Sequence, residues 1–339
     1  MTDPTVEPTG RRKHGRDDEL SAAWLREVCL DAGADDVGFV ALDTPGLEGE
    51  LGHVREALPS TQSLIAVCVR LARDNFRSRA TSNVNTEMDT AIPALDRIGH
   101  RISVALQDRG FRSLYPSVTF PMEAHRLPAR SWTVSHKLVA VAAGLGHMGI
   151  HRCVIHPRFG SFVGLGTIFT EARITPYSQP LDWNPCLGCN LCVASCPVGA
   201  IHKDGSFDFG SCYTHTYGQF VSNFADWIED VADSTDAGDY YQRVSPGENV
   251  AKQHRQYRSG YCVSVCPAGE DVIGPFLADR KRHLHEVVRP LQEKPEYVYV
   301  AQGSNAEAHA RKHFPHKTLR FVESGIQPPD GIDAAPDLP

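Results

Sequence analysis

Four closely spaced cysteines constrain this chain more than any other feature of its sequence. They lie in the run CLGCNLCVASCP, at Cys186, Cys189, Cys192 and Cys196, and Pro197 follows the last one. This C-x2-C-x2-C-x3-C-P spacing is typical of bacterial ferredoxins, in which the first three thiolates bind one cubane cluster and the fourth binds a second cluster. A zinc site is the alternative, but zinc knuckles pair two C-x2-C units and need neither the third close cysteine nor the proline. The motif therefore predicts iron–sulfur clusters.

A second half-motif, C-V-S-V-C-P, occupies residues 262–267, and one more cysteine lies between the two motifs. Two-cluster ferredoxins use a crossed arrangement, in which each cluster takes one ligand from the other cluster's motif. The first cluster, a [4Fe–4S] centre, is therefore expected to take four thiolates: Cys186, Cys189, Cys192 and Cys266. The second is expected to take three: Cys196, Cys212 and Cys262.

The second cluster is one thiolate short. Ser259 stands three residues before Cys262, where a C-x2-C motif has its first cysteine. Three explanations are open: a serine alkoxide ligand, a [3Fe–4S] centre, or a [4Fe–4S] centre completed by another oxygen or nitrogen donor. His254 and His215 are the candidate nitrogen donors. Because a hard oxygen donor suits iron–sulfur chemistry less well than thiolate, we expect this cluster to be labile or shifted in potential.

The other three cysteines, Cys29, Cys68 and Cys153, lie in apolar segments away from the motifs. We interpret all three as small buried hydrophobic residues. Ten cysteines in a cytoplasmic chain suit thiolate–metal chemistry better than disulfides.

The charge and hydropathy of the chain limit its partners. A formal net charge of −7 argues against a broad nucleic-acid-binding face. No apolar stretch approaches membrane-spanning length, so no membrane partner is expected. Arg11 and Arg12 are followed by charged residues instead of an apolar segment, which is unlike an export signal. The sequence therefore predicts a cytoplasmic protein.

Helical and strand patterns alternate before the cysteine motifs. Ser21 is expected to cap a helix that Gly33 ends, and further helices are predicted over 92–107 and 135–144. Apolar strands are predicted within 35–42, 63–71, 152–156 and 162–170. This alternation indicates an α/β domain. After the motifs, EYVYVA, a helix opened by the capping box at Ser304, and TLRFV predict a small βαβ-like segment.

The expected organisation has five parts. These are a disordered tail (1–19), an α/β domain (20–180), a ferredoxin-like domain (181–275), a C-terminal helix with the βαβ-like segment (276–324) and a second disordered tail (325–339). Gly144, Gly146 and Gly149 match G-x-G-x-x-G, but they follow a helix and open none, so we do not interpret them as a dinucleotide site.

Residues 142–171, AAGLGHMGIHRCVIHPRFGSFVGLGTIFTE, precede the ferredoxin motif at a distinctive separation. With both cysteine motifs, they make the chain resemble the epoxyqueuosine reductase and reductive dehalogenase superfamily, from about Trp24 to Gly274. The resemblance implies a mixed α/β and α+β fold, in which a nitroreductase-like cobalamin domain is joined to a ferredoxin-like domain with two [4Fe–4S] clusters.

The resemblance also implies site residues. Expected catalytic residues are Tyr115, Arg130 and His136, although a structural role is the alternative for His136. Cofactor contacts are expected from seven residues: Gly144, Gly146, His147, Gly160, Ser161, Gly164 and Gly166. A tightly packed glycine strand is the alternative for the glycines.

Three departures from the epoxyqueuosine reductase pattern concern its acid, its lysine and one cluster cysteine. Residues 130–132 contain no aspartate, Ile150 replaces the lysine, and Ser259 replaces the cysteine. Together with the net charge, these departures lead us to expect no tRNA partner.

The combined expectation is an iron–sulfur oxidoreductase that passes single electrons from two clusters to cobalamin, for reductive cleavage of an epoxide-type or organohalide-type small molecule. A ferredoxin-type or flavodoxin-type protein is the expected low-potential electron donor. The alternatives are a cobalamin-free electron-transfer protein and an epoxyqueuosine (tRNA) reductase. Flavin is the less favoured cofactor of the α/β domain.

Overall fold

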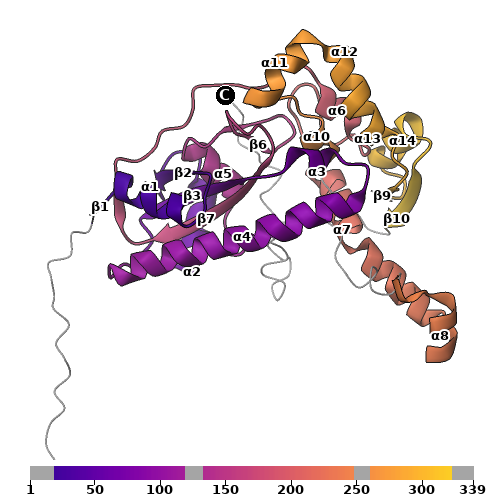
Figure 1. The fold of residues 1–339 in the computed structure, drawn as a ribbon, viewed down its shortest axis with the longest axis horizontal. Helices are drawn as coiled ribbons and strands as arrows, with labels where there is room; N and C mark the ends of the chain where they lie inside the picture. Colours follow the sequence, from indigo (N-terminus) through magenta and orange to yellow (C-terminus); the bar gives the residue numbers. More distant parts are fainter. Residues whose placement is uncertain (1–18, 119–132, 248–259, 323–339) are drawn as a thin grey trace, which may run out of the picture.

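The computed structural model describes residues 19–118, 133–247 and 260–322. The first part is a layered domain of sheet and helices, and the second part gathers short helices and a small sheet around the cysteine motifs (Figure 1). The mixed helix-and-strand fold class expected from the sequence is confirmed. Both predicted tails fall outside the described residues, except that Glu19 lies in a short strand.

The central sheet has four strands in the order β2-β3-β7-β4, and every neighbouring pair is antiparallel. The strands are β2 (Asp36–Ala41), β3 (Ser63–Arg70), β4 (Ser113–Leu114) and β7 (Val163–Thr170). Alternating helices and strands would also suit a parallel sheet. The antiparallel pairing makes this domain α+β, the first of the two forms given for the fold class.

Strand β3 shows why helices cover both faces of the sheet. Its side chains alternate between the faces, and each face meets a separate apolar cluster. Ile65 and Val67 belong to one cluster, and Leu64 and Ala66 belong to the other. The first cluster includes residues of α1 (Ala22–Asp31) and α4 (Thr81–Asp108), and the second includes residues of α2 (Leu51–Ala57) and α5 (His136–Ala142).

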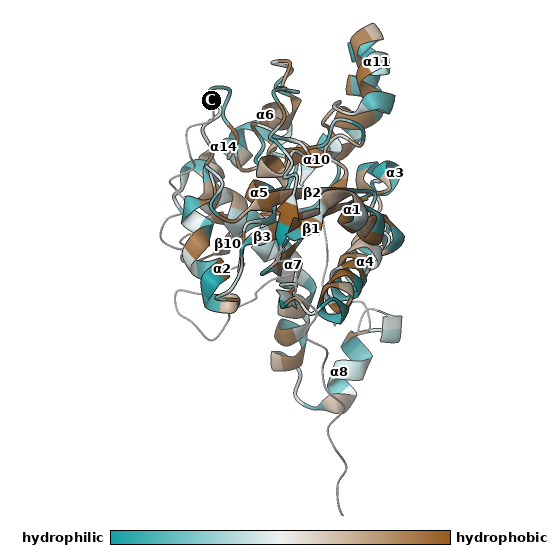
Figure 2. Cartoon of the chain, turned by 90° about the vertical axis from the view of Figure 1, so that its left-hand side faces the viewer, coloured by the Kyte–Doolittle hydropathy of each residue, from teal (hydrophilic) through white to brown (hydrophobic). Residues whose placement is uncertain are grey.

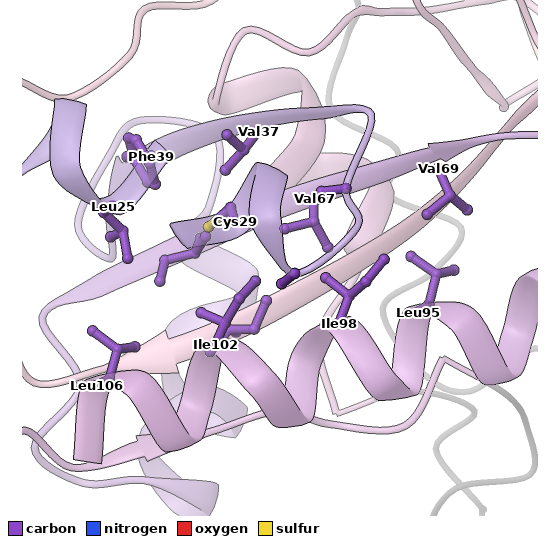
Figure 3. Close-up of a cluster of buried hydrophobic side chains, with 14 of the residues drawn as sticks. Leu25, Cys29, Val37, Phe39, Val67, Val69, Leu95, Ile98, Ile102 and Leu106 are labelled. Atoms are coloured by element: carbon purple, nitrogen blue, oxygen red, sulfur yellow. The ribbon is translucent and has the colours of Figure 1, made fainter. Parts of the chain in front are cut away.

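Helix α4 lies lengthwise across its face of the sheet (Figure 1). Its residues Leu95, Ile98, Ile102 and Leu106 point toward β2, β3 and α1 in Figure 3. The prediction started this helix at Ile92, but it starts at Thr81 and contains Pro93. The earlier start has a tertiary cause, because Val84 is buried and Met88 packs against the same cluster.

The other predicted elements of this domain are confirmed. Ser21 caps α1 by accepting a hydrogen bond from the Trp24 N–H, and Ser135 caps α5 in the same way from Leu138. Cys29 and Cys68 are buried in the two apolar clusters, as expected, and burial raises the pKa of each thiol to about 12.

Short elements complete the domain. They are β1 (Glu19–Ser21), which pairs in parallel with β8 (Arg173–Thr175), the hairpin of β5 (His147–Met148) and β6 (Val154–Ile155), the 3-10 turn η1 (Glu48–Glu50), and α3 (Arg73–Arg77).

The second part of the chain is mostly short helices. They are α6 (Leu191–Ser195), α7 (Phe209–Ala232), α8 (Ala237–Arg243), α10 (Tyr261–Ser264), α11 (Glu270–Ala278), α12 (Arg280–His283), the π-helical turn η2 (Leu284–Val288) and α13 (Arg289–Gln292). Helix α7 packs against β9 (Tyr297–Ala301), where Gln219 donates to the Tyr297 carbonyl, and its far end and α8 extend away from the rest of the molecule (Figure 1). In Figure 2, residues of α8 are mostly polar, whereas hydrophobic residues gather in the central elements.

The predicted βαβ-like segment is confirmed. It consists of β9 (Tyr297–Ala301), α14 (Asn305–His313) and β10 (Thr318–Val322), and its two strands pair in parallel. Ser304 caps α14 by accepting from the Glu307 N–H at 3.2 Å. Val298 and Val300 of β9 share an apolar cluster with Cys192 and Cys196, so this segment packs beside the cysteine motifs.

In the part of the chain that the structure describes, no helix combines the length and apolarity needed to cross a bilayer.

Position 38, where β2 meets α5, should tolerate only glycine. A Cβ atom at this position would overlap the main-chain oxygen of Ala143, and backbone cannot move aside as a flexible side chain can. We expect Gly38→Ala to lower the free energy of unfolding by about 1–3 kcal/mol or more, the range for overpacked cores. Chemical denaturation would measure the change. Gly52→Ala is the matched control, because a Cβ there meets no atom within 4 Å; equal stabilities of the two variants would contradict the prediction.

Candidate iron–sulfur centre

The four cysteines expected to hold the first cluster come together in the structure. Burial, followed by the charges of Cys189 and Cys266, raises the pKa of the Cys192 thiol to about 12. Burial likewise raises the pKa of Cys189, with Cys266 and Cys186 adding to the effect. Each thiol is thus an electrostatic neighbour of thiols from both motifs, which is the crossed arrangement that the spacing predicts.

A tight loop shapes this first set. Gly188 has φ +68° and Asn190 has φ +54°, so the chain turns twice through the left-handed region before α6 begins. Asn190 Nδ2 donates to the Gly188 carbonyl at 3.0 Å, and the Cys186 N–H donates to Asn184 Oδ1 at 2.9 Å. Because a glycine reaches this φ without steric cost, the loop can fold three cysteines around one cluster.

The second set contains four cysteines instead of the expected three. Cys262 has Cys153, Cys212 and Cys196 as electrostatic neighbours. Burial, and then the charge of Cys196, raises the pKa of Cys212 to about 11, and Cys153 also adds to this shift. The expectation that Cys153 is merely a small buried hydrophobic residue therefore does not hold.

Cys153 and Cys262 are electrostatic neighbours. The interaction between them is the first cause of the pKa shift of each thiol: it lowers the pKa of Cys153 and raises that of Cys262. Sequence reasoning missed Cys153 because it belongs to no spaced motif. The one clue in the sequence was a count: the second cluster lacked one thiolate ligand, while three cysteines had not been assigned to a cluster.

Cys196 is held by main-chain N–H groups. The Ala200 N–H donates to its sulfur at 3.3 Å, and Val198, Gly199 and Ile201 also direct main-chain N–H groups at it. These groups lower the pKa of the thiol, although burial outweighs them and raises it overall. N–H groups aimed at sulfur are a means by which proteins set the potential of iron–sulfur clusters.

The donor sets suit clusters better than single metal ions. Within the described ranges, no three His, Cys, Asp or Glu side chains are close enough to bind one ion together. In a cubane cluster each thiolate binds a different iron atom, so its cysteines lie farther apart than the ligands of one ion. Eight thiols in two sets of four therefore fit two [4Fe–4S] clusters.

His151 lies between the two sets. Burial lowers its pKa, but the Cys153 and Cys266 thiols beside the ring outweigh burial and raise it to about 10. The ring accepts the Cys153 N–H at Nδ1, at 3.1 Å. Its Nε2 is buried and has no geometrically sound hydrogen-bond partner among the described residues. A buried N–H group without a partner is costly, and cluster sulfur is an acceptor that would satisfy it.

The second cysteine motif is anchored to the first domain. Ser161 Oγ donates to the Val263 carbonyl at 3.0 Å, and Ser264 Oγ donates to the Phe76 carbonyl at 2.9 Å. Arg77 Nε donates to the Ser264 carbonyl at 3.0 Å. Burial raises the pKa of Cys266, but its interactions with the nearby His151 ring, the Ala268 main chain and Ser161 lower it below its usual value.

The βαβ-like segment supports the same motif from the other side. The buried Lys317 Nζ lies 3.2 Å from Glu296 Oε1 and donates to Tyr261 Oη at 3.0 Å. Tyr261 immediately precedes Cys262. His309 Nε2 lies 3.1 Å from the Cys196 carbonyl oxygen. Both contacts fix the backbone next to cysteines of the second set.

The glycines expected to approach a cofactor lie against protein atoms. A Cβ at Gly160, which has φ +65°, would overlap the Ala268 carbonyl oxygen. A Cβ at Gly144 would overlap the Gln179 carbonyl oxygen, and a Cβ at Gly146 would lie only 2.5 Å from the Ile155 carbonyl oxygen. Gly164 and Gly166 pack beneath Leu95 of α4, with Cβ distances of 3.2 and 3.5 Å. This is the tightly packed alternative, and these positions form no cradle for cobalamin.

The expected catalytic residues are only partly described. His136 is buried, and its Nδ1 lies 2.9 Å from Thr167 Oγ1. Burial lowers its pKa to about 4. The half-buried Tyr115 packs over Gly99. Its ring meets that of His100 edge-on, with 6.2 Å between the ring centroids. Arg130 lies outside the described residues.

The remaining predicted residues are also placed in part. His147 Nδ1 lies 2.9 Å from the carbonyl oxygen of the next residue, Met148. His215 is buried and accepts the Tyr299 N–H at Nδ1. Ser259 and His254 lie outside the described residues.

Comparison with known proteins addresses the cysteine motif directly. Residues 180–202 match the family model described as a 4Fe-4S binding domain. The iron–sulfur prediction is confirmed.

Curated proteins similar to this chain include epoxyqueuosine reductases. The one from Bacillus cereus is 34% identical over 98 residues, which cover 28% of this chain and 25% of that protein. The one from Staphylococcus aureus is 33% identical over 174 residues, covering 51% of this chain and 38% of the relative. The solved epoxyqueuosine reductase of Streptococcus thermophilus is 16% identical, with a TM-score of 0.44 over 86% of this chain and 80% of that one. The expected resemblance is confirmed, and the chain spans well under half the length of these curated relatives.

The two cysteine sets should be separable by mutation. We expect Cys192→Ala to remove the first cluster and Cys212→Ala to remove the second, each lowering the iron content from about eight to about four atoms per chain. Electron paramagnetic resonance of the reduced proteins should show a different cluster signal surviving in each variant. Loss of both signals from a folded single variant would contradict the assignment.

His136 should make stability depend on pH. Its pKa is about 4 in the folded protein and 6.5 when unperturbed, so the unfolded chain binds its proton first as the pH falls. This group's contribution is complete above pH 6.5 and is lost as the pH falls toward 4, by about 2 kcal/mol at pH 5. Denaturation at pH 7.5 and pH 5 should therefore show a smaller loss in His136→Gln than in the wild type. Equal losses would contradict the shifted pKa.

Proposed function

We propose that this protein is a two-cluster iron–sulfur reductase that delivers single electrons to a substrate that undergoes reductive cleavage. The observation that carries the proposal is the gathering of eight thiols into two sets of four, with His151 between them. Each cluster stores one electron at a time, and two clusters this close form a short relay. A low-potential ferredoxin or flavodoxin is the proposed electron donor.

Epoxyqueuosine is the first substrate to test. The names of the curated relatives support it, and their similarity covers up to about half of this chain. The net charge of −7 argued against a tRNA partner, but it describes the chain as a whole. A pocket of about 130 Å³ beside the second cysteine motif is lined by charged residues of both signs: Arg70, Arg73, Arg158, Glu270 and Asp271. Asp271 pairs with Arg70 at 3.6 Å and with Arg73 at 3.1 Å, so the lining carries only a small excess of positive charge to offer a phosphate-bearing substrate.

The proton for the cleavage must come from a group other than His136. With a pKa of about 4, this histidine is neutral near pH 7 and has no acidic proton comparable to that of an imidazolium. Its ring instead orients Thr167 on β7 through the 2.9 Å contact. Tyr115 and Arg130 remain the other expected catalytic residues, and of these two Tyr115 is the proposed proton donor.

Cobalamin is part of the proposal through sequence resemblance alone. When bound, cobalamin supplies a strongly reducing and nucleophilic metal centre. The packed glycines do not support its presence, and they favour a second candidate function, a cobalamin-free electron-transfer protein with no small-molecule substrate.

One experiment separates these candidates. The protein would be reconstituted anaerobically with iron and sulfide, with or without hydroxocobalamin, and then desalted. Reduced ferredoxin and epoxyqueuosine-containing tRNA would be added, and mass spectrometry of the digested nucleosides would detect queuosine. We expect turnover, with a stoichiometric Co(II) signal if cobalamin is retained.

The outcomes are distinct. Intact clusters without retained cobalt or any product would favour the electron-transfer protein. Retained cobalt without queuosine would exclude the epoxyqueuosine substrate and direct the search to organohalides. A matched control is the Cys212→Ala protein, which should lose turnover because the relay is incomplete.

A further inference from the structure

The second cluster needs one ligand beyond the cysteines that the sequence assigns to it. The inference rests on the two-cluster part of the proposed function and is independent of the substrate. Cys196, Cys212 and Cys262 form an incomplete set, and the sequence offered only Ser259 or a histidine to finish it. His215 is one of those histidines, and its Nδ1 already accepts the main-chain N–H of Tyr299.

A tight turn presents Cys153 to this set. The residue ends the turn between β5 and β6, where the Gly149 N–H donates to the Cys153 carbonyl at 3.0 Å. The Arg152 N–H donates to the Gly149 carbonyl at 2.8 Å, and Arg152 itself has φ +58°. His151 Nδ1 accepts the Cys153 N–H at 3.1 Å. The backbone on the amino side of this cysteine is therefore fixed by hydrogen bonds.

The Cys153 thiol faces the cysteines of the second set. Cys262 is its first electrostatic partner, and Cys212 is another electrostatic neighbour. Cys262 in turn has Cys196 and Cys212 as neighbours. Cys153 and Cys262, which are far apart in the sequence, thus have neighbouring sulfur atoms in the fold.

Positive charge stands beside this sulfur. Lys137 Nζ lies 3.9 Å from Cys153 Sγ and donates to the Arg152 carbonyl at 2.8 Å, so the ammonium group is held in place. A cluster with four thiolates carries net negative charge, which a nearby ammonium group stabilises.

We propose that Cys153 is the fourth thiolate ligand of the second cluster, which makes it a [4Fe–4S] centre held by Cys153, Cys196, Cys212 and Cys262. Thiolate is a softer donor than the serine oxygen and suits iron–sulfur chemistry better. On binding, the Cys153 thiol releases its proton to solvent, and its sulfur donates an electron pair to one iron atom. No electron is gained or lost in this step, so it requires no oxidant or reductant.

The test compares Cys153→Ala with Ser259→Ala in the full-length, anaerobically reconstituted protein. Iron and sulfide would be assayed chemically, and paramagnetic resonance would be recorded on the oxidised and reduced forms. We expect Cys153→Ala to lose the second cluster or to show an oxidised [3Fe–4S] signal, with the first cluster unchanged. Ser259→Ala should keep both clusters. Cys68→Ala is the control for removal of a thiol distant from the clusters.

Three results would overturn the proposal. The first is a folded Cys153→Ala protein with two intact [4Fe–4S] clusters. The second is loss of the second cluster from Ser259→Ala when Cys153→Ala retains it. The third is loss of both clusters from a folded Cys153→Ala protein. A wild type with one cluster would instead contradict the two-cluster assignment. A small external thiol should restore the [4Fe–4S] signal of Cys153→Ala, which a merely structural role for Cys153 does not predict.

A measurement on the wild type covers the case in which Cys153→Ala fails to fold. Iodoacetamide would be applied to the cluster-loaded protein and to the same protein after chelation, and alkylated cysteines would be identified by mass spectrometry. Cys153 is half-buried, so we expect it to be modified after chelation and protected, together with Cys262, while the cluster is present. Equal modification of Cys153 in both states would contradict ligation.

Discussion

Cubane clusters require four sulfur atoms at fixed mutual distances, and the arrangement of this molecule follows from that requirement. The thiols come from segments that are widely separated along the chain, so tertiary contacts must bring them together before any iron binds. The decisive contacts are those of residues 262–268 with the first domain. Ser161 binds the Val263 carbonyl, Arg77 binds the Ser264 carbonyl, and Gly160 admits the Ala268 main chain. These contacts turn an interface between domains into part of the metal site.

Local charge matters more here than the overall acidity of the chain. Thiolate clusters are negative, and their surroundings contain Lys137 and the N–H groups that converge on Cys196. The buried Nε2 of His151 lies beside one cysteine of each set, which gives both clusters a common polar neighbour. Changes at this histidine are therefore expected to affect the two potentials together.

Features that depend on local spacing could be predicted from the sequence. The cysteine motif predicted that Cys186 and Cys266 lie together, as they do in one packed cluster, and alternating apolar residues located β2 and β3. Features that depend on distant partners could not be predicted in this way. Cys153 becomes a neighbour of Cys262 only because the turn after β5 meets α10, and a single cysteine has no spacing from which this could be predicted. The reason for the glycines of β7 could not be predicted from the sequence either, because a bound ligand and a closely packed helix both require a residue without a Cβ.

The proposed ligation of one cluster by both Cys192 and Cys266 has a consequence for how the chain unfolds. Cluster ligation closes a loop of about seventy-five residues with strong bonds, much as a disulfide does, and loops of this size restrict the unfolded ensemble by several kcal/mol. Without iron, only the hydrogen bonds and packing around residues 262–268 hold the loop closed. Removal of the metal is therefore expected to make residues 192–266 easier to unfold.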